Sequence, residues 1–257
     1  MENKIFTISN LAFSYGKHGV LQNLNLSVEE GKVTTLIGGN GCGKSTLFQL
    51  MTKNLTPEKG SIQYRNTEIS QIRLKDYAKE IAIVHQYNTA PADLSVEKLV
   101  SYGRTPYHSF GKRNPEEDEE KIHWAMEITN TLKYKEKPVS ELSGGQKQRV
   151  WIAMALAQGT KVLFLDEPTT YLDIRYQLQI LKLIRRLNRE FGMTIIMVLH
   201  DINQSIYYSD EIIAMKTGKV LAQGKPENIV TGQLLKMVYD IELPVHMVDG
   251  SPYVFAV

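Results

Sequence analysis

A phosphate-binding pattern between an apolar segment and a helix-forming segment constrains the fold of this chain more than any other stretch. Residues 38–45 match G-x-x-x-x-G-K-[ST]. The preceding Val33–Ile37 is rich in β-branched residues and predicts a buried strand, and Ser45–Met51 predicts the following helix. Glycines let successive backbone N–H groups turn inward on a phosphate, and the helix N-terminus adds partial positive charge. The pattern therefore predicts a nucleotide phosphate site in an α/β fold.

Each position of this loop is a candidate ligand-binding residue. Lys44 is expected to reach the β- and γ-phosphates, and the Ser45 hydroxyl is expected to ligate Mg²⁺. The full set of candidate residues in the loop is Gly38, Gly39, Asn40, Gly41, Cys42, Gly43, Lys44, Ser45 and Thr46. A Gly-rich turn without a ligand is the weaker alternative, because the strand and the helix that the motif requires are both present.

Composition limits the classes of protein that remain. At 257 residues and 42% hydrophobic content, the chain fits one large α/β domain with room for a subdomain. The 30 Lys and Arg residues are nearly balanced by 28 Asp and Glu, which argues against a dedicated nucleic-acid binder. The longest apolar run, Val150–Ala157, is under half of the ~20 residues that a membrane helix needs. A single cysteine, Cys42, excludes an internal disulfide and suits a reducing cytosol.

Local patterns predict the elements around the loop. Ile5–Tyr15 and Leu21–Val28 alternate apolar and polar residues, which predicts two antiparallel strands. Further strands are predicted at Ser61–Tyr64, Ile81–Val84, Val162–Asp166 and Thr194–Leu199, with two short ones at Glu211–Met215 and Lys219–Ala222. A long amphipathic helix is predicted over Arg175–Glu190, and two small helices after Pro226.

Between about residues 88 and 140 the composition favours helices. Ser95 is expected to cap a helix that runs through Gly103, and Asn114 followed by Pro115 is a second helix start. The acidic run 116–120 is most simply a solvated face that complements the helix dipole. Ser143 and two glycines begin a buried helix and form a second anion-receiving N-terminus, which suggests a nucleotide bound to another copy of the chain.

The order of the motifs resembles that of the ABC ATPase family. That order is phosphate loop, strand-terminal glutamine, Ser-Gly-Gly helix start, Asp-Glu strand end and strand-terminal histidine, and its most specific element is Leu-Ser-Gly-Gly-Gln at 142–146. The resemblance implies one P-loop NTPase domain over residues 1–257, with an antiparallel β subdomain and a helical subdomain inserted at about 88–158. It also implies ATP and Mg²⁺ as the bound groups.

The resemblance gives each strand-end residue a catalytic role. Asp166 and Gln86 would bind Mg²⁺ with Ser45, and Glu167 would orient or deprotonate the attacking water. His200 would contact the γ-phosphate. Without the order of motifs, His200 would be interpreted as a structural histidine and the acid pair as a solvated strand end.

Other residues are expected to act on the nucleotide from outside the loop. Tyr15 would stack on the adenine, although alone it is more typical of a half-buried strand aromatic. By the resemblance, four residues would close on the nucleotide of a second copy, with Asp173 in the loop that crosses the dimer; the four are Ser143, Gly144, Gly145 and Gln146.

Further stretches narrow the resemblance to the ATPases of bacterial importers of iron(III)-siderophores, relatives of the haem and vitamin B12 importers. These stretches include Tyr102–Tyr107 and the segment 166–173, in which Tyr171 favours the siderophore branch. The implied partners are a second copy, two membrane-spanning permeases contacted through residues 86–107, and indirectly a substrate-binding protein, at the cytoplasmic face of the membrane. Haem or cobalamin import, a soluble ABC ATPase of DNA repair or iron–sulphur cluster assembly, and an ATP-gated switch without turnover remain alternatives.

Overall fold

The computed structural model describes residues 3–108 and 114–255. The chain forms two compact units. Unit 1 consists of Met1–Ile72 and Asn188–Val257, and unit 2 is Arg73–Leu187. In the described part of the chain, no helix is both long and apolar enough to span a membrane. Each unit is described by itself below.

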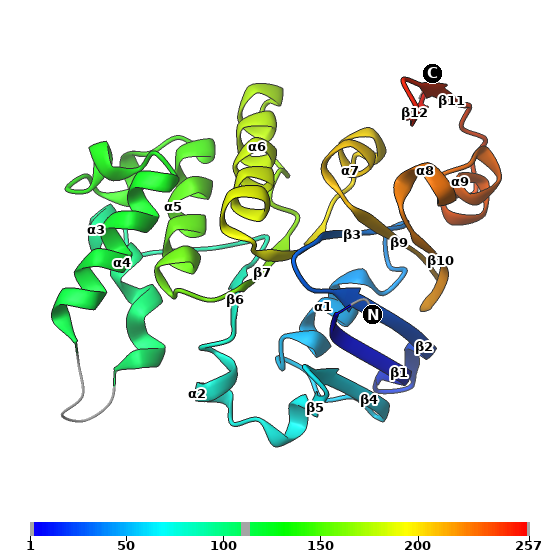
Figure 1. Cartoon of the computed structure of the whole chain (residues 1–257), viewed down its shortest axis with the longest axis horizontal. Helices are drawn as coiled ribbons and strands as arrows, with labels where there is room; N and C mark the ends of the chain where they lie inside the picture. The colour runs from blue at the N-terminus through cyan, green and yellow to red at the C-terminus, as the bar shows by residue number, and fades with distance from the viewer. Residues whose placement is uncertain (1–2, 109–113, 256–257) are drawn as a thin grey trace. The chain divides into compact units, whose positions relative to one another are not determined.

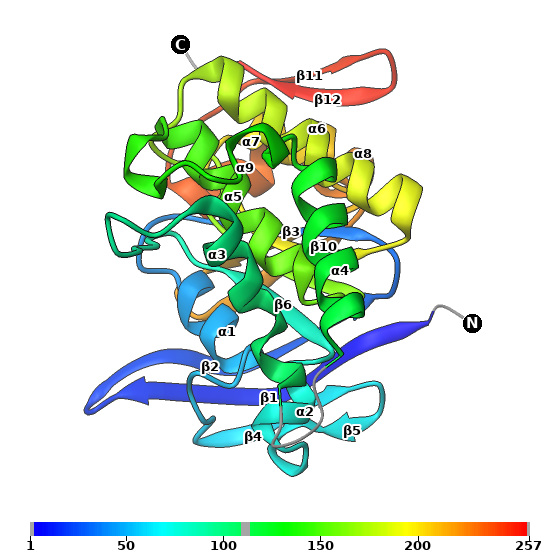
Figure 2. The same cartoon turned by 90° about the vertical axis from the view of Figure 1, so that its left-hand side faces the viewer.

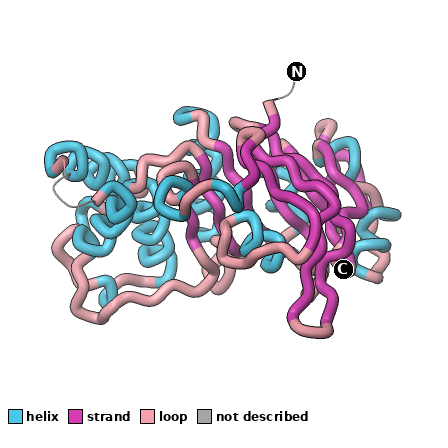
Figure 3. Tube along the Cα trace, turned by 90° about the horizontal axis from the view of Figure 1, so that it is seen from below, coloured by secondary structure: helices cyan, strands magenta, loops and turns pink. Residues whose placement is uncertain are grey.

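Unit 1 begins with an antiparallel sheet. Its strands are β1 (Lys4–Tyr15), β2 (His18–Glu29), β4 (Lys59–Tyr64) and β5 (Thr67–Glu68), in the order β2-β1-β4-β5. The predicted N-terminal hairpin is confirmed, and Figure 3 shows it as the long magenta ribbon that starts near the N-terminus. The turn between the two strands is shorter than predicted, because β2 begins at His18 and not at Leu21. Alternation in β2 buries Leu24, Leu26 and Val28 on one face.

A second sheet of unit 1 places two candidate segments at one edge. Its strands are β3 (Val33–Ile37), β8 (Thr194–Val198), β9 (Glu211–Lys216) and β10 (Lys219–Gly224), in the order β10-β9-β3-β8. β3 is parallel to β8, with Leu36 opposite Val198, and all residues of both strands are buried. The phosphate loop and His200 therefore leave the sheet at the same edge.

Helices and a hairpin complete unit 1. The helices are α1 (Lys44–Met51), a 3₁₀ turn η1 (Ile69–Gln71), α7 (Ile202–Tyr208), α8 (Pro226–Ile229) and α9 (Gly232–Tyr239). The hairpin of β11 (Val245–Val248) and β12 (Ser251–Val254) lies beside α7 and α8 (Figure 1). It was not predicted, although Asp249 and Gly250, with φ of 49° and 79°, are a two-residue hairpin turn.

Unit 2 contains a parallel strand pair with helices. β6 (Ile81–Val84) has its predicted bounds and runs parallel to β7 (Val162–Asp166), with Val84 opposite Leu165. Gln86 and the Asp166–Glu167 pair therefore leave these strands at the same edge. The helices outside the 88–158 segment are α2 (Leu74–Tyr77), which was not predicted, and α6 (Ile174–Phe191), which is two residues longer than expected and ends beyond the unit boundary.

Among the described residues of the segment 88–158, the regular elements are helices. It contains α3 (Val96–Ser101), α4 (Pro115–Ile128), α5 (Gly144–Ala157) and the 3₁₀ turns η2 (Tyr102–Tyr107), η3 (Leu132–Tyr134) and η4 (Val139–Glu141). α3 and α4 contact α5, and the three helices lie together in Figure 2. Both predicted caps are present: Ser95 accepts from the Lys98 N–H and Asn114 from the Glu117 N–H. The α-helix ends at Ser101, not Gly103, because the chain tightens into η2 there.

A buried arginine explains much of the Tyr102–Tyr107 sequence. Arg104 is 2% exposed, and its Nε donates to Asp118 Oδ1 at 2.8 Å while Nη1 donates to the Ala157 carbonyl at 3.1 Å. Its guanidinium lies 4.1 Å from the Tyr107 ring centroid. Burial raises the pKa of Tyr107, although Arg104 beside it acts in the opposite direction. The interpretation of 116–120 as a solvated run is therefore wrong at Asp118, which is 3% exposed and neutralises Arg104.

We expect Arg104→Met to reduce the free energy of unfolding by about 3–5 kcal/mol, because the buried Asp118 carboxylate would lose the guanidinium, while the His108 ring stays 3.0 Å from its other oxygen. Urea unfolding measures the change. Arg73→Met is the matched control, since the Arg73–Asp76 ion pair, at 2.6 Å, lies on the surface and should contribute little. Asp118→Asn in the Arg104→Met background should recover part of the loss. Equal effects of Arg104→Met and Arg73→Met would contradict the role of burial.

Candidate functional site

The phosphate loop of unit 1 has backbone angles that only glycine adopts readily. Gly38, Gly41 and Gly43 have φ of 151°, 73° and 106°, and they turn the chain from β3 into α1. Gly43 is the N-cap of α1 and supplies no side-chain acceptor, so the first N–H groups of the helix have no side-chain cap. Lys44 Nζ donates to the carbonyls of Gly38 at 2.7 Å and Gly39 at 3.0 Å. The loop thus combines backbone donors with an ammonium group, which suits a phosphate chain.

Packing behind the loop fixes its shape. The Gly218 N–H donates to the Cys42 carbonyl at 2.9 Å, and a Cβ on Gly43 would lie 2.6 Å from Leu21. Cys42 is 6% exposed, which agrees with a small residue that fits the turn. Tyr239, which the sequence did not indicate, receives a hydrogen bond from the Gly38 backbone, and burial raises its pKa to about 12.

Two further candidates lie in unit 1. His200 is exposed and follows β8, directly before Asp201, which caps α7 by accepting from the Gln204 N–H at 2.8 Å. Tyr15 ends β1, is 50% exposed and meets Phe13 edge-on at 5.0 Å. An exposed ring at a strand end can accept a planar base on its free face.

In unit 2 the structure brings the strand-terminal glutamine to the acid pair. Gln86 Nε2 donates to Glu167 Oε2 at 2.5 Å, and the Thr170 hydroxyl donates to the same oxygen at 3.0 Å. Asp166 is the last residue of β7. The contact forms because β6 and β7 are parallel and end at the same edge. A carboxylate held by two donors has a defined direction, which a general base requires.

A tyrosine pair joins the same two loops. The hydroxyls of Tyr87 and Tyr171 are 3.0 Å apart, and both side chains are exposed. This hydrogen bond raises the pKa of Tyr87 above its ordinary value, and the nearby Glu167 carboxylate acts in the same direction. Nothing in the sequence pattern indicated that Tyr87 and Tyr171 would meet, because they are separated by the whole helical segment.

The Ser-Gly-Gly segment contacts the loop that follows the acid pair. Ser143 caps α5 in a capping box with Gln146, whose side chain accepts from the Ser143 N–H at 2.9 Å. A Cβ on Gly145 would lie 2.3 Å from the Tyr176 ring, whereas one on Gly144 would lie 3.6 Å from its nearest neighbour. Asp173 caps α6 by accepting from the Tyr176 N–H at 3.0 Å. The glycine at 145 is therefore required by Tyr176.

We expect Gly145→Ala to lower the free energy of unfolding by about 1–3 kcal/mol, because its methyl group would overlap the Tyr176 ring and force the 173–176 turn to move. Gly144→Ala is the control, since its methyl group would be in ordinary contact. Thermal unfolding of both variants measures the difference. If the two variants have the same midpoint, close packing of Tyr176 does not explain Gly145.

The donor types of the candidate residues fit ATP with magnesium. The Ser45 hydroxyl, the Gln86 amide oxygen and the Asp166 carboxylate are the hard oxygen ligands that Mg²⁺ takes alongside nucleotide phosphates and waters. Among residues 3–108 and 114–255, no group of three or more His, Cys, Asp and Glu side chains is placed to hold a metal ion.

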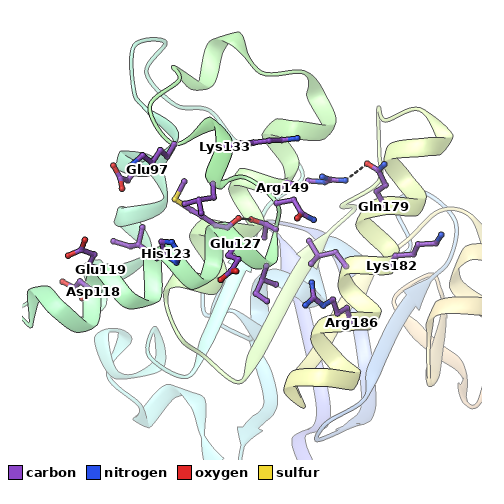
Figure 4. Close-up of a pocket in the computed structure, with 18 of the residues that line it drawn as sticks. Glu97, Asp118, Glu119, His123, Glu127, Lys133, Arg149, Gln179, Lys182 and Arg186 are labelled. Carbon is purple, nitrogen blue, oxygen red and sulfur yellow. Dashed lines mark hydrogen bonds between the residues drawn. The ribbon is translucent and has the colours of Figure 1, made fainter.

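A separate cavity of about 1370 Å³ lies in unit 2 between α4, α5 and α6 (Figure 4). Figure 4 shows Arg149, Lys182 and Arg186 on one side and Glu119 and His123 on the other. The predicted site residues are all absent from its lining. Its wall has no glycine-rich backbone, so it differs in chemistry from the phosphate loop.

Comparison with known proteins shows the family of this chain. Residues 21–170 match the family model described as ABC transporter. The chain is 48% identical to the iron(3+)-hydroxamate import ATP-binding protein FhuC of Bacillus subtilis (strain 168), over 90% of this chain and 86% of that protein. It is 41% identical to the petrobactin import ATP-binding protein FpuC of Bacillus anthracis, over 97% and 92% of the two chains.

Solved structures have the same fold. CbiO1 from Clostridium perfringens, part of the ABC transporter complex cbiONQ, superposes with a TM-score of 0.80 and 33% identity, over 93% of this chain and 97% of that chain. The dimeric bacterial ABC transporter cassette MJ0796 superposes with a TM-score of 0.74 and 28% identity, over 86% and 98%. The predicted ABC ATPase fold is thereby confirmed.

Proposed function

This chain belongs to the ABC transporter family, and from that premise we propose that it is the ATP-hydrolysing subunit that powers import of an iron(III)-siderophore chelate through a membrane transporter. One observation carries the proposal: 48% identity over 90% of the chain to an iron(3+)-hydroxamate import ATP-binding protein. The FpuC relative is also named for import of a siderophore, petrobactin. Haem and cobalamin remain cargo alternatives that neither of these names supports.

Unit 1 supplies the nucleotide-binding residues in this proposal. The backbone N–H groups of residues 38–46 bind the phosphates, and Lys44 exchanges its contacts with the Gly38 and Gly39 carbonyls for the β- and γ-phosphate oxygens. Tyr15 stacks on the adenine with its exposed ring. His200 approaches the γ-phosphate from the sheet edge that it shares with the phosphate loop.

Unit 2 supplies the residues that act on water and metal. Asp166 and Gln86 would hold Mg²⁺ together with Ser45 of unit 1. The ion, when bound, neutralises charge that develops on the phosphates. Glu167 orients the attacking water and accepts its proton. The donors that hold the Glu167 carboxylate in the described structure, at 2.5 and 3.0 Å, support this role because they aim one oxygen.

The active unit in this proposal is a dimer of two copies. Ser143, Gly144, Gly145 and Gln146 of one copy bind the nucleotide of the other, and Asp173 lies in the loop that crosses between them. The dimeric cassette among the similar structures supports this arrangement. Within one copy, Tyr176 packs on Gly145, so a movement of the 173–176 turn would act directly on the Ser-Gly-Gly segment.

Two membrane-spanning subunits complete the transporter, and this chain binds to them peripherally at the cytoplasmic face of the membrane. The segment from Gln86 to Tyr107 contacts these subunits. Within it, Arg104 is buried and Tyr107 packs on its guanidinium, whereas Tyr102 is 47% exposed. Tyr102 is therefore the better candidate for direct contact.

We expect purified protein to hydrolyse ATP only with Mg²⁺, and Glu167→Gln to lower turnover by about 10²-fold or more, because the amide cannot accept the proton of the water. Phosphate release measures turnover, and equilibrium binding of ATP is the control that should be unchanged. If the chain were an ATP-gated switch without turnover, the wild-type chain assembled with its membrane subunits would release no phosphate. Full activity of Glu167→Gln would overturn the assignment of the base.

We expect Tyr102→Ala to weaken binding to the membrane subunits by about tenfold while ATP affinity is unchanged, because an exposed aromatic anchor would be lost. Tyr253→Ala is the matched control: Tyr253 is 46% exposed but lies in the C-terminal hairpin. Co-purification and transport in reconstituted vesicles measure the effect. Equal loss in both variants would remove Tyr102 from the contact surface.

A further inference from the structure

The chain around Glu167 has an unusual conformation that Thr170 maintains. Glu167 has a φ of 50°, in the left-handed region that residues with a Cβ rarely adopt. The Thr170 N–H donates to the Glu167 carbonyl at 3.2 Å, and its hydroxyl donates to Glu167 Oε2 at 3.0 Å. One residue thus closes the turn through its backbone and aims the carboxylate through its side chain. Such strained positions persist only where surrounding contacts fix them.

Glu167 Oε2 has a second donor that the proposed mechanism removes. Gln86 Nε2 donates to this oxygen at 2.5 Å. Gln86 would bind Mg²⁺ through Oε1, and a rotation of its side chain towards the metal would take Nε2 away from the carboxylate. Of these two donors, Thr170 would then stay in place. Thr170 is only three residues from Glu167, and its N–H closes the turn that carries Glu167, so its hydroxyl belongs to the same turn as the carboxylate.

We propose that Thr170 is a positioning residue for hydrolysis: its hydroxyl holds the Glu167 carboxylate in the direction needed to take the proton of the attacking water once Gln86 has left. The inference rests on the proposed role of Glu167 as the base. It goes beyond that role because it assigns the orientation of the base to a side chain outside the proposed nucleotide- and metal-binding residues.

The adjacent hydroxyl provides a matched control. Tyr171 lies one residue further along the same turn, and its hydroxyl contacts Tyr87, 3.0 Å away. Removing either hydroxyl changes the same loop by one oxygen atom. Only the Thr170 hydroxyl has Glu167 as its hydrogen-bond partner.

The experiment measures kcat and KM for ATP in the full chain assembled with its membrane subunits. Thr170→Val keeps the shape of the side chain and is expected to lower kcat by about 10- to 100-fold, with KM within about twofold, because a misdirected base slows the chemical step and not binding. Thr170→Ser should restore most of kcat, since it keeps the hydroxyl. Tyr171→Phe should have the kcat of the wild type.

Several results would overturn the inference: wild-type kcat in Thr170→Val, a rise in KM in place of a fall in kcat, or a Thr170→Ser variant as slow as Thr170→Val. Thermal unfolding of each variant checks folding, and if Thr170→Val is unstable the comparison of Thr170→Ala with Thr170→Ser replaces it. The Glu167→Gln variant distinguishes a failure of the proposed base from a failure of the proposed role of Thr170. Full turnover in Glu167→Gln would refute the base itself, whereas its loss together with an active Thr170→Val refutes only the role of Thr170.

Discussion

Parallel pairing of buried strands is the constraint on which the candidate site depends. In unit 1, β3 lies in register with β8, so the phosphate loop and His200 begin at one edge of the sheet. In unit 2, β6 lies in register with β7, so Gln86 and Glu167 begin at one edge and meet through a hydrogen bond of 2.5 Å. Because parallel strands have their carboxyl ends on the same side, residues far apart in sequence gather there without a dedicated scaffold.

Within unit 2, close packing then links the loops that follow β6 and β7. In unit 2 the chain from Glu167 to Tyr176, a turn followed by the start of α6, has contacts at both ends: Gln86 and Tyr87 meet the turn, and Gly145 meets Tyr176 in α6. A displacement of this turn would therefore reach both the segment proposed to contact membrane subunits and the segment proposed to contact a second nucleotide. Packed side chains transmit such movements because protein interiors leave few voids.

Several elements could be predicted because their signals are local. The phosphate loop, the caps Ser95 and Asn114, and strand β6 were found from patterns of fewer than ten residues each. The end of α3 was misplaced because the C-terminal end of a helix has a weaker sequence signal than its N-terminal end. The C-terminal hairpin was missed because β11 exposes most of its residues, so its sequence does not alternate between apolar and polar residues. The Asp249–Gly250 turn was the signal available for it.

The sequence by itself determined the family, the strand ends that carry chemistry and the residue types at each one, since motif spacing and strand periodicity are properties of neighbouring residues. Only the tertiary structure decided which side chains meet. The burial of Asp118 against Arg104, the need for glycine opposite Tyr176, and the hydrogen bond from Thr170 to Glu167 all depend on contacts between segments or on backbone angles. Burial and hydrogen bonding are set by the folded arrangement of the chain, and a pattern along the sequence does not contain that arrangement.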